Sequence, residues 1–410
     1  MGNAALQVPE QNFKWRSAPL LQCRAVRPGE RWIFSAGFNV RPDLKETSRI
    51  DCELADIRHI SLAGGRVAIL SHQGDFGDGT ALRLDFVARY LAAYLGQPVT
   101  YVPDCVGDAA IAKSRSMRDG EVAVFGNTRH HDGEQTNNLQ LARAFSKLGE
   151  FVAVAGFSKA HRAHASNVGI LHFRPGYLAS SVLSQIHQLS PWTERRPEQF
   201  SVAVLGGRKE EKLKIALCGF GKIYDLIIPG GVVLNCILKV LGYDVGGSYL
   251  GENETANLES AQKALREAKA DIFVPSQVII AAKNGGFPQG GKLIDIRDGV
   301  DQEDAIVDFV LDRQVSMALR RLVKFRGRMI IAGTPARYRE GFHTACEPIL
   351  TAARALGNRA ILLGGDTMAD LPFDGNKSVG GGSALQYICD GDLPILAALV
   401  DQSCHKEIRA

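Results

Sequence analysis

The sequence predicts an α/β protein with two domains, each built on a parallel sheet flanked by helices. Apolar runs rich in Val, Ile and Leu recur about every thirty to forty residues, and amphipathic stretches separate them. This series is interrupted near residue 190 and starts again near residue 200. The chain has 410 residues, of which 45% are hydrophobic and 22% are charged, so it is long enough to bury two separate cores.

In the first half, short apolar runs predict strands and longer amphipathic runs predict helices. The first thirty residues lack either pattern and are expected to form an irregular extension. Because strands and helices alternate after them, βαβ units are favoured over hairpins. We expect strands at 32–34, 67–70, 122–125 and 151–154, and helices at 82–95 and 139–148.

The domain boundary is expected just after an amphipathic helix at residues 178–189. The next segment, 190–200, contains two prolines and four charged residues. We therefore expect a first domain at 1–190 and a second domain that begins at 191, with the helix as a hinge between them.

The second half repeats the alternation, with several strands that run into glycines. Residues 284–301 are rich in glycine and are expected to form an irregular, exposed loop. We expect strands at 202–205, 226–228, 272–274, 329–331 and 360–363, and a helix at 257–269.

Composition argues against several classes of protein. The formal net charge is only +4, and lysine and arginine form no long block, so we expect neither a nucleic-acid nor a membrane partner. The eight cysteines contain no CxxC pair, which favours reduced thiols and a cytoplasmic protein over a zinc site or a disulfide framework. No apolar run reaches the roughly 18 residues that a membrane span needs.

Five polar islands, most of them at the ends of predicted strands, favour an anion site in the first domain. Ligands of open α/β sheets bind at the carboxyl ends of strands, and each island supplies an Arg, a His or an Asn. The densest is 161–166, with the sequence HRAHAS. Together the islands at 34–40, 47–50, 71–74, 126–131 and 161–166 offer Asn39, Arg49, His72, Arg129, His161, Arg162 and His164.

Glycine pairs in the second half predict a phosphate-binding site. Glycine lets the main chain approach a phosphate closely, and a helix that starts there supplies amide donors. The chain has neither a Walker A pattern nor a complete GxGxxG, so the argument depends on several pairs together. The candidates are Gly206, Gly207, Lys209, Gly230, Gly231, Gly365, Asp366, Thr367, Gly380, Gly381 and Gly382.

In order and spacing, these segments resemble the phosphoglycerate kinase family over about residues 32 to 400. The five islands are similar to its segments RVDFNVP, DxTRI, SHLGRP, ENLRFH and AFGTAHRAHAS, and the glycine pairs to GGAKVSDK, GGGMA, GGGDS/T and STGGGAS. The resemblance implies two Rossmann-like three-layer αβα domains joined by a hinge helix. It also implies a second domain at 191–395, a tail at 396–410 that returns to the first domain, and a monomer.

The resemblance further implies transfer of a phosphoryl group between ATP or ADP and a small anionic carboxylic acid, with Mg²⁺ bound. The acid would lie on the basic islands and the nucleotide on the second domain. Arg49 would be the catalytic arginine, Lys209 would lie beside the phosphates, and Asp366 would hold Mg²⁺ with Thr367 near it. Gly380 to Gly382 would cradle the group in transfer, with Gly381 and Gly382 acting in catalysis.

The motifs depart from the family's pattern at informative positions. Gly37 stands where the family has an aspartate that receives the substrate hydroxyl, and Asp75 where it has an arginine of the phosphate cradle. An anion there would lose a charged hydrogen bond worth about 1.5 to 3 kcal/mol, and Asp75 would add repulsion. The basic residues His130, His131 and Lys159 are further expected to contribute to a cationic pocket. Restoring Gly37→Asp and Asp75→Arg should raise activity with 3-phosphoglycerate.

The nucleotide motifs are also altered. The second lysine of GGAKVSDK falls on Leu213, although Lys212 and Lys214 flank it and a shift of one residue would restore the cation. The ribose-binding glutamate becomes Arg339, and residues 312–315 replace GPKT. Three alternatives stay open: a kinase of this kind with a changed acceptor, a genuine phosphoglycerate kinase, and a catalytically silent relative that binds an anion or a nucleotide.

Overall fold

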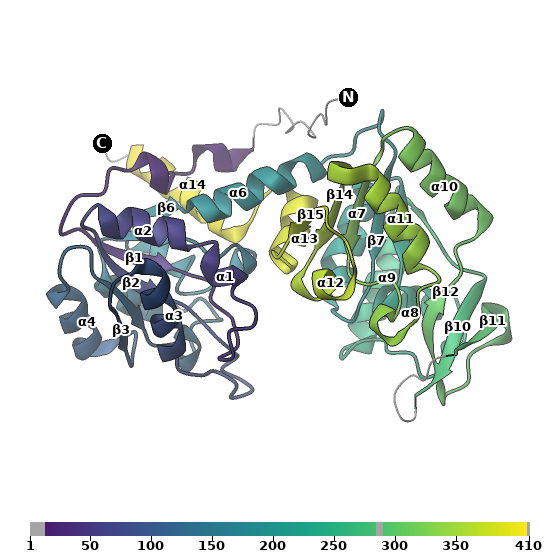
Figure 1. The fold of residues 1–410 in the computed structure, drawn as a ribbon, viewed down its shortest axis with the longest axis horizontal. Helices are drawn as coiled ribbons and strands as arrows, with labels where there is room; N and C mark the ends of the chain where they lie inside the picture. The colour runs from purple at the N-terminus through teal and green to yellow at the C-terminus, as the bar shows by residue number, and fades with distance from the viewer. Residues whose placement is uncertain (1–12, 284–289, 408–410) are drawn as a thin grey trace. The chain divides into compact units, whose positions relative to one another are not determined.

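A computed structural model describes residues 13–283 and 290–407, which form two compact units (Figure 1). The first unit contains the described residues up to Gln188 together with those from Asp392 onward. The second unit is Leu189–Gly391. Each unit has its own parallel sheet and its own core.

The first unit is built on a six-stranded parallel sheet with the order β3-β4-β2-β1-β5-β6. Its strands are β1 (Arg31–Ser35), β2 (Arg66–Leu70), β3 (Val99–Val102), β4 (Val122–Phe125), β5 (Phe151–Val154) and β6 (Gly176–Leu178). Its helices are α1 (Ser48–Asp51), α2 (Leu54–Leu62), α3 (Asp85–Leu95), α4 (Gly107–Ser116), α5 (Leu139–Phe145), α6 (Ser180–Leu189) and α14 (Pro394–Glu407).

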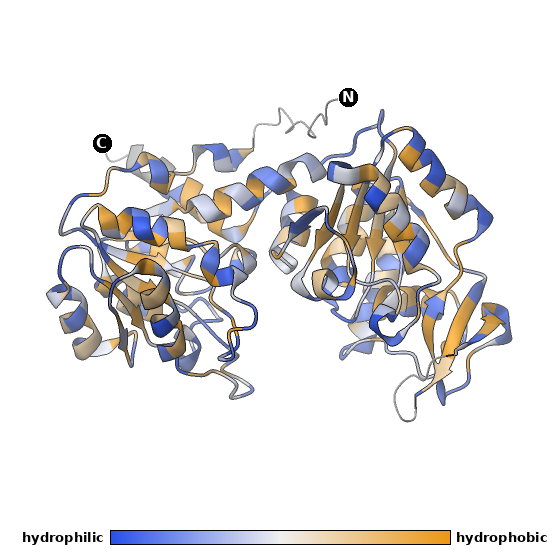
Figure 2. Cartoon of the chain, viewed as in Figure 1, coloured by the Kyte–Doolittle hydropathy of each residue, from blue (hydrophilic) through white to orange (hydrophobic). Residues whose placement is uncertain are grey.

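The strands expected in the first half are confirmed, because their side chains are apolar on both faces. All four residues of β4 are buried, as are four of the five residues of β2, which is what a parallel sheet covered by helices on both faces requires. The helix expected at 139–148 is shorter, since α5 ends at Phe145 and a 3₁₀ turn follows it. Figure 2 shows the apolar residues gathered on the sheet strands.

The prediction of an irregular extension over the first thirty residues is wrong for the part that is described. Residues 14–17 and 21–23 form 3₁₀ turns, and Trp15 and Leu21 are buried. Trp15 packs on the ring of His187, with the ring centroids 5.6 Å apart. The aromatic side chains of this segment therefore belong to the core of the first unit.

The second unit contains a six-stranded parallel sheet with the order β15-β14-β13-β7-β8-β9. Its strands are β7 (Ser201–Leu205), β8 (Leu226–Pro229), β9 (Asp271–Ile272), β13 (Arg328–Ala332), β14 (Ala360–Leu363) and β15 (Asn376–Ser378). Its helices are α7 (Cys218–Ile223), α8 (Gly231–Val240), α9 (Glu254–Glu267), α10 (Arg313–Lys324), α11 (Cys346–Leu356), α12 (Gly365–Asp370) and α13 (Gly382–Asp390).

A small antiparallel sheet in the second unit was not predicted. Its strands β10 (Gln277–Ala282), β11 (Lys292–Asp295) and β12 (Asp304–Phe309) have the order β11-β10-β12. The expectation of an irregular loop over 284–301 is wrong for residues 292–295, which form β11, while 284–289 lie outside the described residues. Strand β11 was missed because glycines flank it and because it is half exposed and only weakly apolar.

Among the described residues, no single helix is both long and apolar enough to cross a membrane. Two short helices, α13 and the first part of α14, pass that test of length and composition only when they are taken together.

Candidate active site

The basic islands follow strands that are neighbours in the first sheet. β4, β2, β1 and β5 lie side by side in that order, and all are parallel. Their carboxyl ends lead into the segments that carry Arg129, His72, Asn39 and Lys159, respectively. The fold therefore brings these islands to one edge of the sheet, where α/β proteins bind ligands.

Two buried asparagines hold the basic islands in place. The Asn127 Oδ1 accepts from the main-chain N–H of Arg129 at 3.0 Å, and its Nδ2 donates to the Gln73 carbonyl at 2.8 Å. The Asn167 Oδ1 accepts from the N–H of His164 at 2.9 Å, and its Nδ2 donates to the Arg162 carbonyl at 2.9 Å. The two asparagine side chains thus fix the main chain of the islands.

The two histidines at the centre of this edge are uncharged at neutral pH. His72 and His164 are each 6% exposed. Burial, reinforced by neighbouring Lys159 and Arg129, lowers the pKa of His72 well below its ordinary value. Burial and the same two cations lower the pKa of His164 to about 3. Burial therefore disfavours the positive charge that was expected of these two side chains.

Lys159 lies inside the first unit rather than on its surface. Its Nζ donates to the Ser35 Oγ at 2.7 Å, and the side chain is 4% exposed. Burial lowers the pKa of Lys159 to about 8, while Glu134 and Glu53 act in the opposite direction. The Glu134 carboxylate is itself held by the Ser166 Oγ at 2.6 Å and lies 4.0 Å from the Nδ1 of His164. The charge of Lys159 is therefore balanced within the core.

Arg129 and Asp75 form an ion pair that the sequence did not predict. The Arg129 Nη1 donates to the Asp75 Oδ2 at 2.6 Å, and Arg129 is only 2% exposed. The Gln135 Nε2 donates to the same carboxylate oxygen at 3.0 Å. Asp75 thus neutralises an arginine that the sequence analysis assigned to the anion.

The remaining predicted substrate residues are held by hydrogen bonds or ion pairs within the first unit. Arg49 lies on α1, and its Nη1 donates to the Asn39 carbonyl at 2.8 Å. The Asn39 Oδ1 accepts from the N–H of Gly74 at 3.3 Å, which connects the islands after β1 and β2. The Arg162 Nε donates to the Nε2 of His161 at 3.2 Å. His130 and His131 are held by the Ala81 carbonyl at 3.3 Å and by the Asp104 carboxylate at 3.2 Å, respectively.

Gly37 is a glycine for a steric reason. A Cβ at this position would lie 2.9 Å from the Cα of Gly156 and 3.2 Å from the Ser158 Oγ. Gly156 has a φ of +74°, and a Cβ there would in turn lie 2.6 Å from the nitrogen of Gly37. The two main chains pack directly on each other, so the side chain expected from the resemblance cannot enter without moving one of them.

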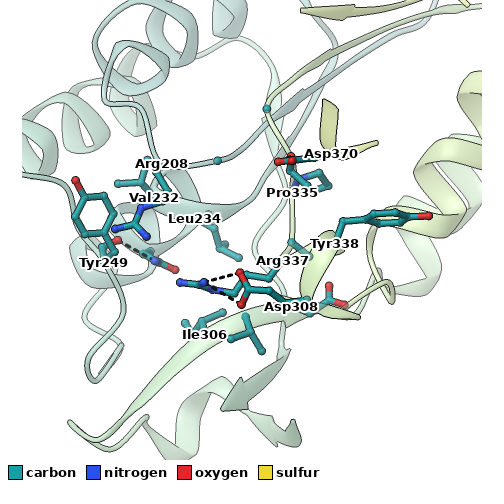
Figure 3. A pocket seen from close by; sticks show the side chains of 18 of the residues that line it. Arg208, Val232, Leu234, Tyr249, Ile306, Asp308, Pro335, Arg337, Tyr338 and Asp370 are labelled. Carbon is teal, nitrogen blue, oxygen red and sulfur yellow. Dashed lines mark hydrogen bonds and ion pairs between the residues drawn. The ribbon is translucent and has the colours of Figure 1, made fainter. Parts of the chain in front are cut away.

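The second unit contains a cavity of about 720 Å³ at the carboxyl ends of β7, β8 and β13 (Figure 3). Several of the predicted nucleotide residues line it, namely Gly207, Lys209, Gly231, Asp366 and Thr367. The cavity is large enough for a nucleotide-sized ligand. Of the other candidates, Gly206, Gly230, Gly365, Gly380, Gly381 and Gly382 lie outside its described lining.

Close main-chain packing explains why glycines form the floor of this cavity. A Cβ at Gly206 would collide with the Thr334 carbonyl, and one at Gly230 with Pro335. Gly231 has a φ of +52°, and its Cβ would collide with the Gly207 carbonyl. The Gly207 N–H donates to the Thr334 carbonyl at 2.8 Å. Gly206 and Gly230 therefore shape the floor although they do not line it.

Two lysines and an aspartate bring charge to the cavity. The Lys209 Nζ lies 2.8 Å from the Asp366 Oδ2, and both side chains are largely exposed. Lys212 also lines the cavity and is half-buried, and desolvation together with neighbouring Lys209 lowers its pKa to about 8. Leu213, by contrast, is fully buried in the core. Of these two neighbouring residues, it is Lys212 that lines the cavity.

A segment of π-helix, Lys212–Leu217, accompanies this arrangement. A π-helix inserts an extra residue per turn relative to an α-helix, so it changes which side chains face the ligand. Its first two residues are Lys212, which lines the cavity, and Leu213, which lies in the core.

Apart from Arg339, the sequence did not indicate the following residues of the cavity, because they lie in loops or in the unpredicted antiparallel sheet. The Arg208 guanidinium lies 4.6 Å from the ring centroid of Tyr249, and Figure 3 shows the two side chains together on one side of the cavity. Arg337 forms an ion pair with Glu340 at 3.0 Å. Arg339, which stands in place of the ribose-binding glutamate, pairs with Asp370 at 2.7 Å. Strand β12 contributes Ile306 to the wall.

The chain is similar to known proteins along most of its length. The sequence model described as phosphoglycerate kinase matches residues 30–399. The chain belongs to the phosphoglycerate kinase family. A phosphoglycerate kinase from Caulobacter vibrioides is 30% identical over 401 residues, which cover 90% of this chain and 96% of the relative. One from Chlorobium chlorochromatii is 29% identical over 391 residues, with the same coverage.

Solved phosphoglycerate kinases share the fold. The structure from Pyrococcus horikoshii OT3 matches with a TM-score of 0.76 at 22% identity and covers 95% of this chain and 100% of its own. The structure from Coxiella burnetii matches with a TM-score of 0.71 at 24% identity and covers 94% of this chain and 99% of its own. The predicted fold of two parallel α/β domains is therefore confirmed.

Within the phosphoglycerate kinase family, the residues at the cavity fit a magnesium nucleotide. Mg²⁺ is commonly bound by one or two carboxylates together with substrate phosphates and water. Asp366 offers such a carboxylate at the start of α12, and its side chain is 79% exposed. Lys209 and Lys212 line the same cavity and would offset the charge of a bound phosphate.

Proposed function

We propose that this protein is a phosphotransferase that forms an acyl phosphate on a small carboxylic acid at the expense of Mg·ATP, or runs that reaction in reverse. The observation that carries the proposal is the second-unit cavity, in which Lys209 and Asp366 are paired beside a glycine floor. A carboxylate beside a lysine is suited to a nucleotide whose phosphates bind both a cation and a metal ion.

The chemistry needs little covalent participation from the protein. A carboxylate oxygen of the acid attacks the γ-phosphorus, the bond from that phosphorus to the β,γ-bridging oxygen breaks, and ADP leaves. Both nucleophile and leaving group are ionised, so no proton has to be transferred. Mg²⁺ would neutralise phosphate charge, Lys209 and Lys212 would bind phosphate oxygens, and Arg49 would stabilise the charge on the group in transfer.

We further propose that the acceptor is an acid other than 3-phosphoglycerate. Gly37 has no room for the aspartate expected from the resemblance, since a Cβ would press on Gly156. Asp75 forms an ion pair with Arg129, which the resemblance assigns to the substrate. Two contacts to 3-phosphoglycerate are therefore lost or opposed.

Two alternatives have their own support. A genuine phosphoglycerate kinase is equally consistent with the family match and with relatives that carry that name at about 30% identity. A silent relative is favoured by the Arg339–Asp370 pair, which stands where the resemblance implies a ribose-binding glutamate. The three differ in whether nucleotide binds and in whether a phosphoryl group is transferred.

Calorimetric titration with Mg·ATP and Mg·ADP tests the nucleotide site, with and without 3-phosphoglycerate. Lys209→Ala should weaken nucleotide binding by roughly tenfold or more, because a charged hydrogen bond to phosphate is lost. Lys214→Ala is the matched control, since Lys214 pairs with Glu210 at 2.9 Å and is not among the residues that line the cavity. Equal effects of both substitutions, or no nucleotide binding by the native chain, would contradict the proposal.

Turnover should depend on Arg49. Arg49→Ala should abolish phosphoryl transfer and leave nucleotide binding unchanged, because Arg49 and the cavity belong to different units. Unaltered turnover in this variant would remove Arg49 from the mechanism.

A further inference from the structure

We infer that the acceptor site selects carboxylic acids that carry no phosphate group, because Asp75 already places a negative charge against Arg129. This inference rests on the proposed function and names the class of acid that the basic islands accept. It makes Asp75 a residue that determines specificity.

Asp75 is held firmly in this position. Its Oδ2 accepts from the Arg129 Nη1 at 2.6 Å and from the Gln135 Nε2 at 3.0 Å, while its Oδ1 accepts from the Gly77 N–H at 2.9 Å. The main-chain N–H of Asp75 donates to the Thr80 Oγ1 at 2.9 Å. Both carboxylate oxygens are thus occupied from within the protein. The Gly77 N–H, with Arg129 and Gln135, lowers the pKa of Asp75, so the group is ionised at neutral pH.

Arg129 cannot easily serve a second anion. It is 2% exposed and follows an asparagine whose Oδ1 fixes its main chain. A buried side chain in a close-packed interior has little freedom to change its position. A phosphate group could reach this guanidinium only by displacing Asp75 or by lying next to its carboxylate, and either route is opposed by charge.

Arg162 also lies near Arg129 and offsets part of the charge of Asp75. The other basic residues contribute less, because burial lowers the pKa of His72 and of His164, and Lys159 lies in the core, where Glu134 and Glu53 act on it. An aspartate in place of an arginine lowers the local charge by two. An acid whose only charge is a single carboxylate is repelled less by Asp75, whose side chain is 42% exposed.

The test compares binding of glycerate and 3-phosphoglycerate, which share one carbon skeleton and differ by the phosphate group. Calorimetry is performed on the full chain, on Asp75→Asn, on Asp75→Arg and on the control Asp78→Asn. Asp78 lies three residues away, and its carboxylate contacts only Thr80 among the described partners. Thermal unfolding of each variant establishes that it is folded.

The native chain should bind 3-phosphoglycerate no more tightly than glycerate. Asp75→Asn should shift the ratio of the two affinities toward 3-phosphoglycerate by at least roughly tenfold, because one opposing charge is removed. Asp75→Arg should shift the ratio further, because it also adds a positive charge. Asp78→Asn should leave the ratio unchanged.

Three results would overturn the inference: preference of the native chain for 3-phosphoglycerate, an unchanged ratio in folded Asp75 variants, or failure of those variants to bind 3-phosphoglycerate. Because the readout is binding alone, it is independent of catalysis. Failure of the proposed function would appear instead as absent phosphoryl transfer, whatever the ratio of affinities.

Discussion

Around the basic islands, the charge of individual side chains depends on burial as much as on residue type. His72, His164 and Lys159 are all basic in the sequence, yet each lies in the interior of the first unit. An interior position disfavours the charged form of a base unless an acid or a hydrogen bond compensates for it. The net charge that a ligand meets is therefore smaller than the number of basic residues indicates.

Loss of stability in acid should follow from His164. Its pKa is about 3 in the folded chain and near 6.5 when unfolded, so between these values the unfolded state binds more protons. The contribution of neutral His164 to the free energy of unfolding is thus fully present above pH 6.5 and decreases as the pH falls toward 3. At pH 5 the decrease is about 2 kcal/mol. Urea unfolding at pH 7 and pH 5 should show that the free energy of unfolding decreases less for His164→Gln than for the native chain. The exposed His130→Gln should behave like the native chain, and the same loss in all three would argue against this assignment.

The contact between Gly37 and Gly156 makes a second prediction. Gly37→Ala should lower the free energy of unfolding by about 1–3 kcal/mol, as expected for overpacking a close contact. Gly77→Ala is the control, because its Cβ would meet only the Asp75 Oδ1, at 3.5 Å. Chemical denaturation compares them, and a Gly37→Ala variant as stable as the control would contradict the steric account. For the same reason Gly37→Asp should not by itself raise activity with 3-phosphoglycerate.

At the scale of elements, the sequence predicted most of the parallel strands but not β3, β6 or β15, and it missed what local patterns do not encode. Fully apolar runs such as β4 indicate a buried strand without any knowledge of the fold. The strand β11 alternates too weakly to be recognised, and the π-helix at 212–217 depends on tertiary packing. The residues of the islands could be named from sequence, but the Arg129–Asp75 pair could not, because its partners are 54 positions apart.

The π-helical placement of Lys212 predicts opposite effects of pH on binding and stability. Its pKa falls from an ordinary value of 10.5 to about 8, so between these values the folded state binds fewer protons than the unfolded state. The stability of the chain without ligand should rise as the pH increases from 8 to 10.5, while nucleotide affinity should fall as the cation is lost. Denaturation and calorimetry at pH 7 and pH 9 measure both trends. Lys212→Met should abolish them, and persistence of both trends in that variant would exclude Lys212 as their source.

At the scale of the whole molecule, the last helix, α14, belongs to the first unit. Residues from Asp392 onward belong to the same unit as the residues up to Gln188, although the complete second unit lies between them in sequence. The Gln402 Oε1 accepts from the Gly176 N–H at 2.8 Å, and its Nε2 donates to the carbonyls of Leu171 and Arg174 at 2.7 and 2.6 Å. The first unit thus depends on both ends of the described chain.

Gln402→Ala should therefore destabilise the first unit selectively. It leaves buried main-chain groups without partners, at a cost of about 1–3 kcal/mol. Calorimetric unfolding should show a lower transition for the first unit, and titration should show unchanged nucleotide binding by the second. The exposed neighbour Asp401→Ala should alter neither. Weakened nucleotide binding in Gln402→Ala would show that the two units are not energetically separate.

The central claim is transfer of a phosphoryl group to a carboxylate, and trapping with hydroxylamine tests it most directly. The native chain and Arg49→Ala are incubated with Mg·ATP, hydroxylamine and either glycerate, 3-phosphoglycerate or a panel of other small carboxylic acids, and the hydroxamate formed from any acyl phosphate is measured. We predict hydroxamate that requires both an acid and Arg49. No hydroxamate with any of the acids, from a protein that binds Mg·ATP, would contradict the account and support a silent relative.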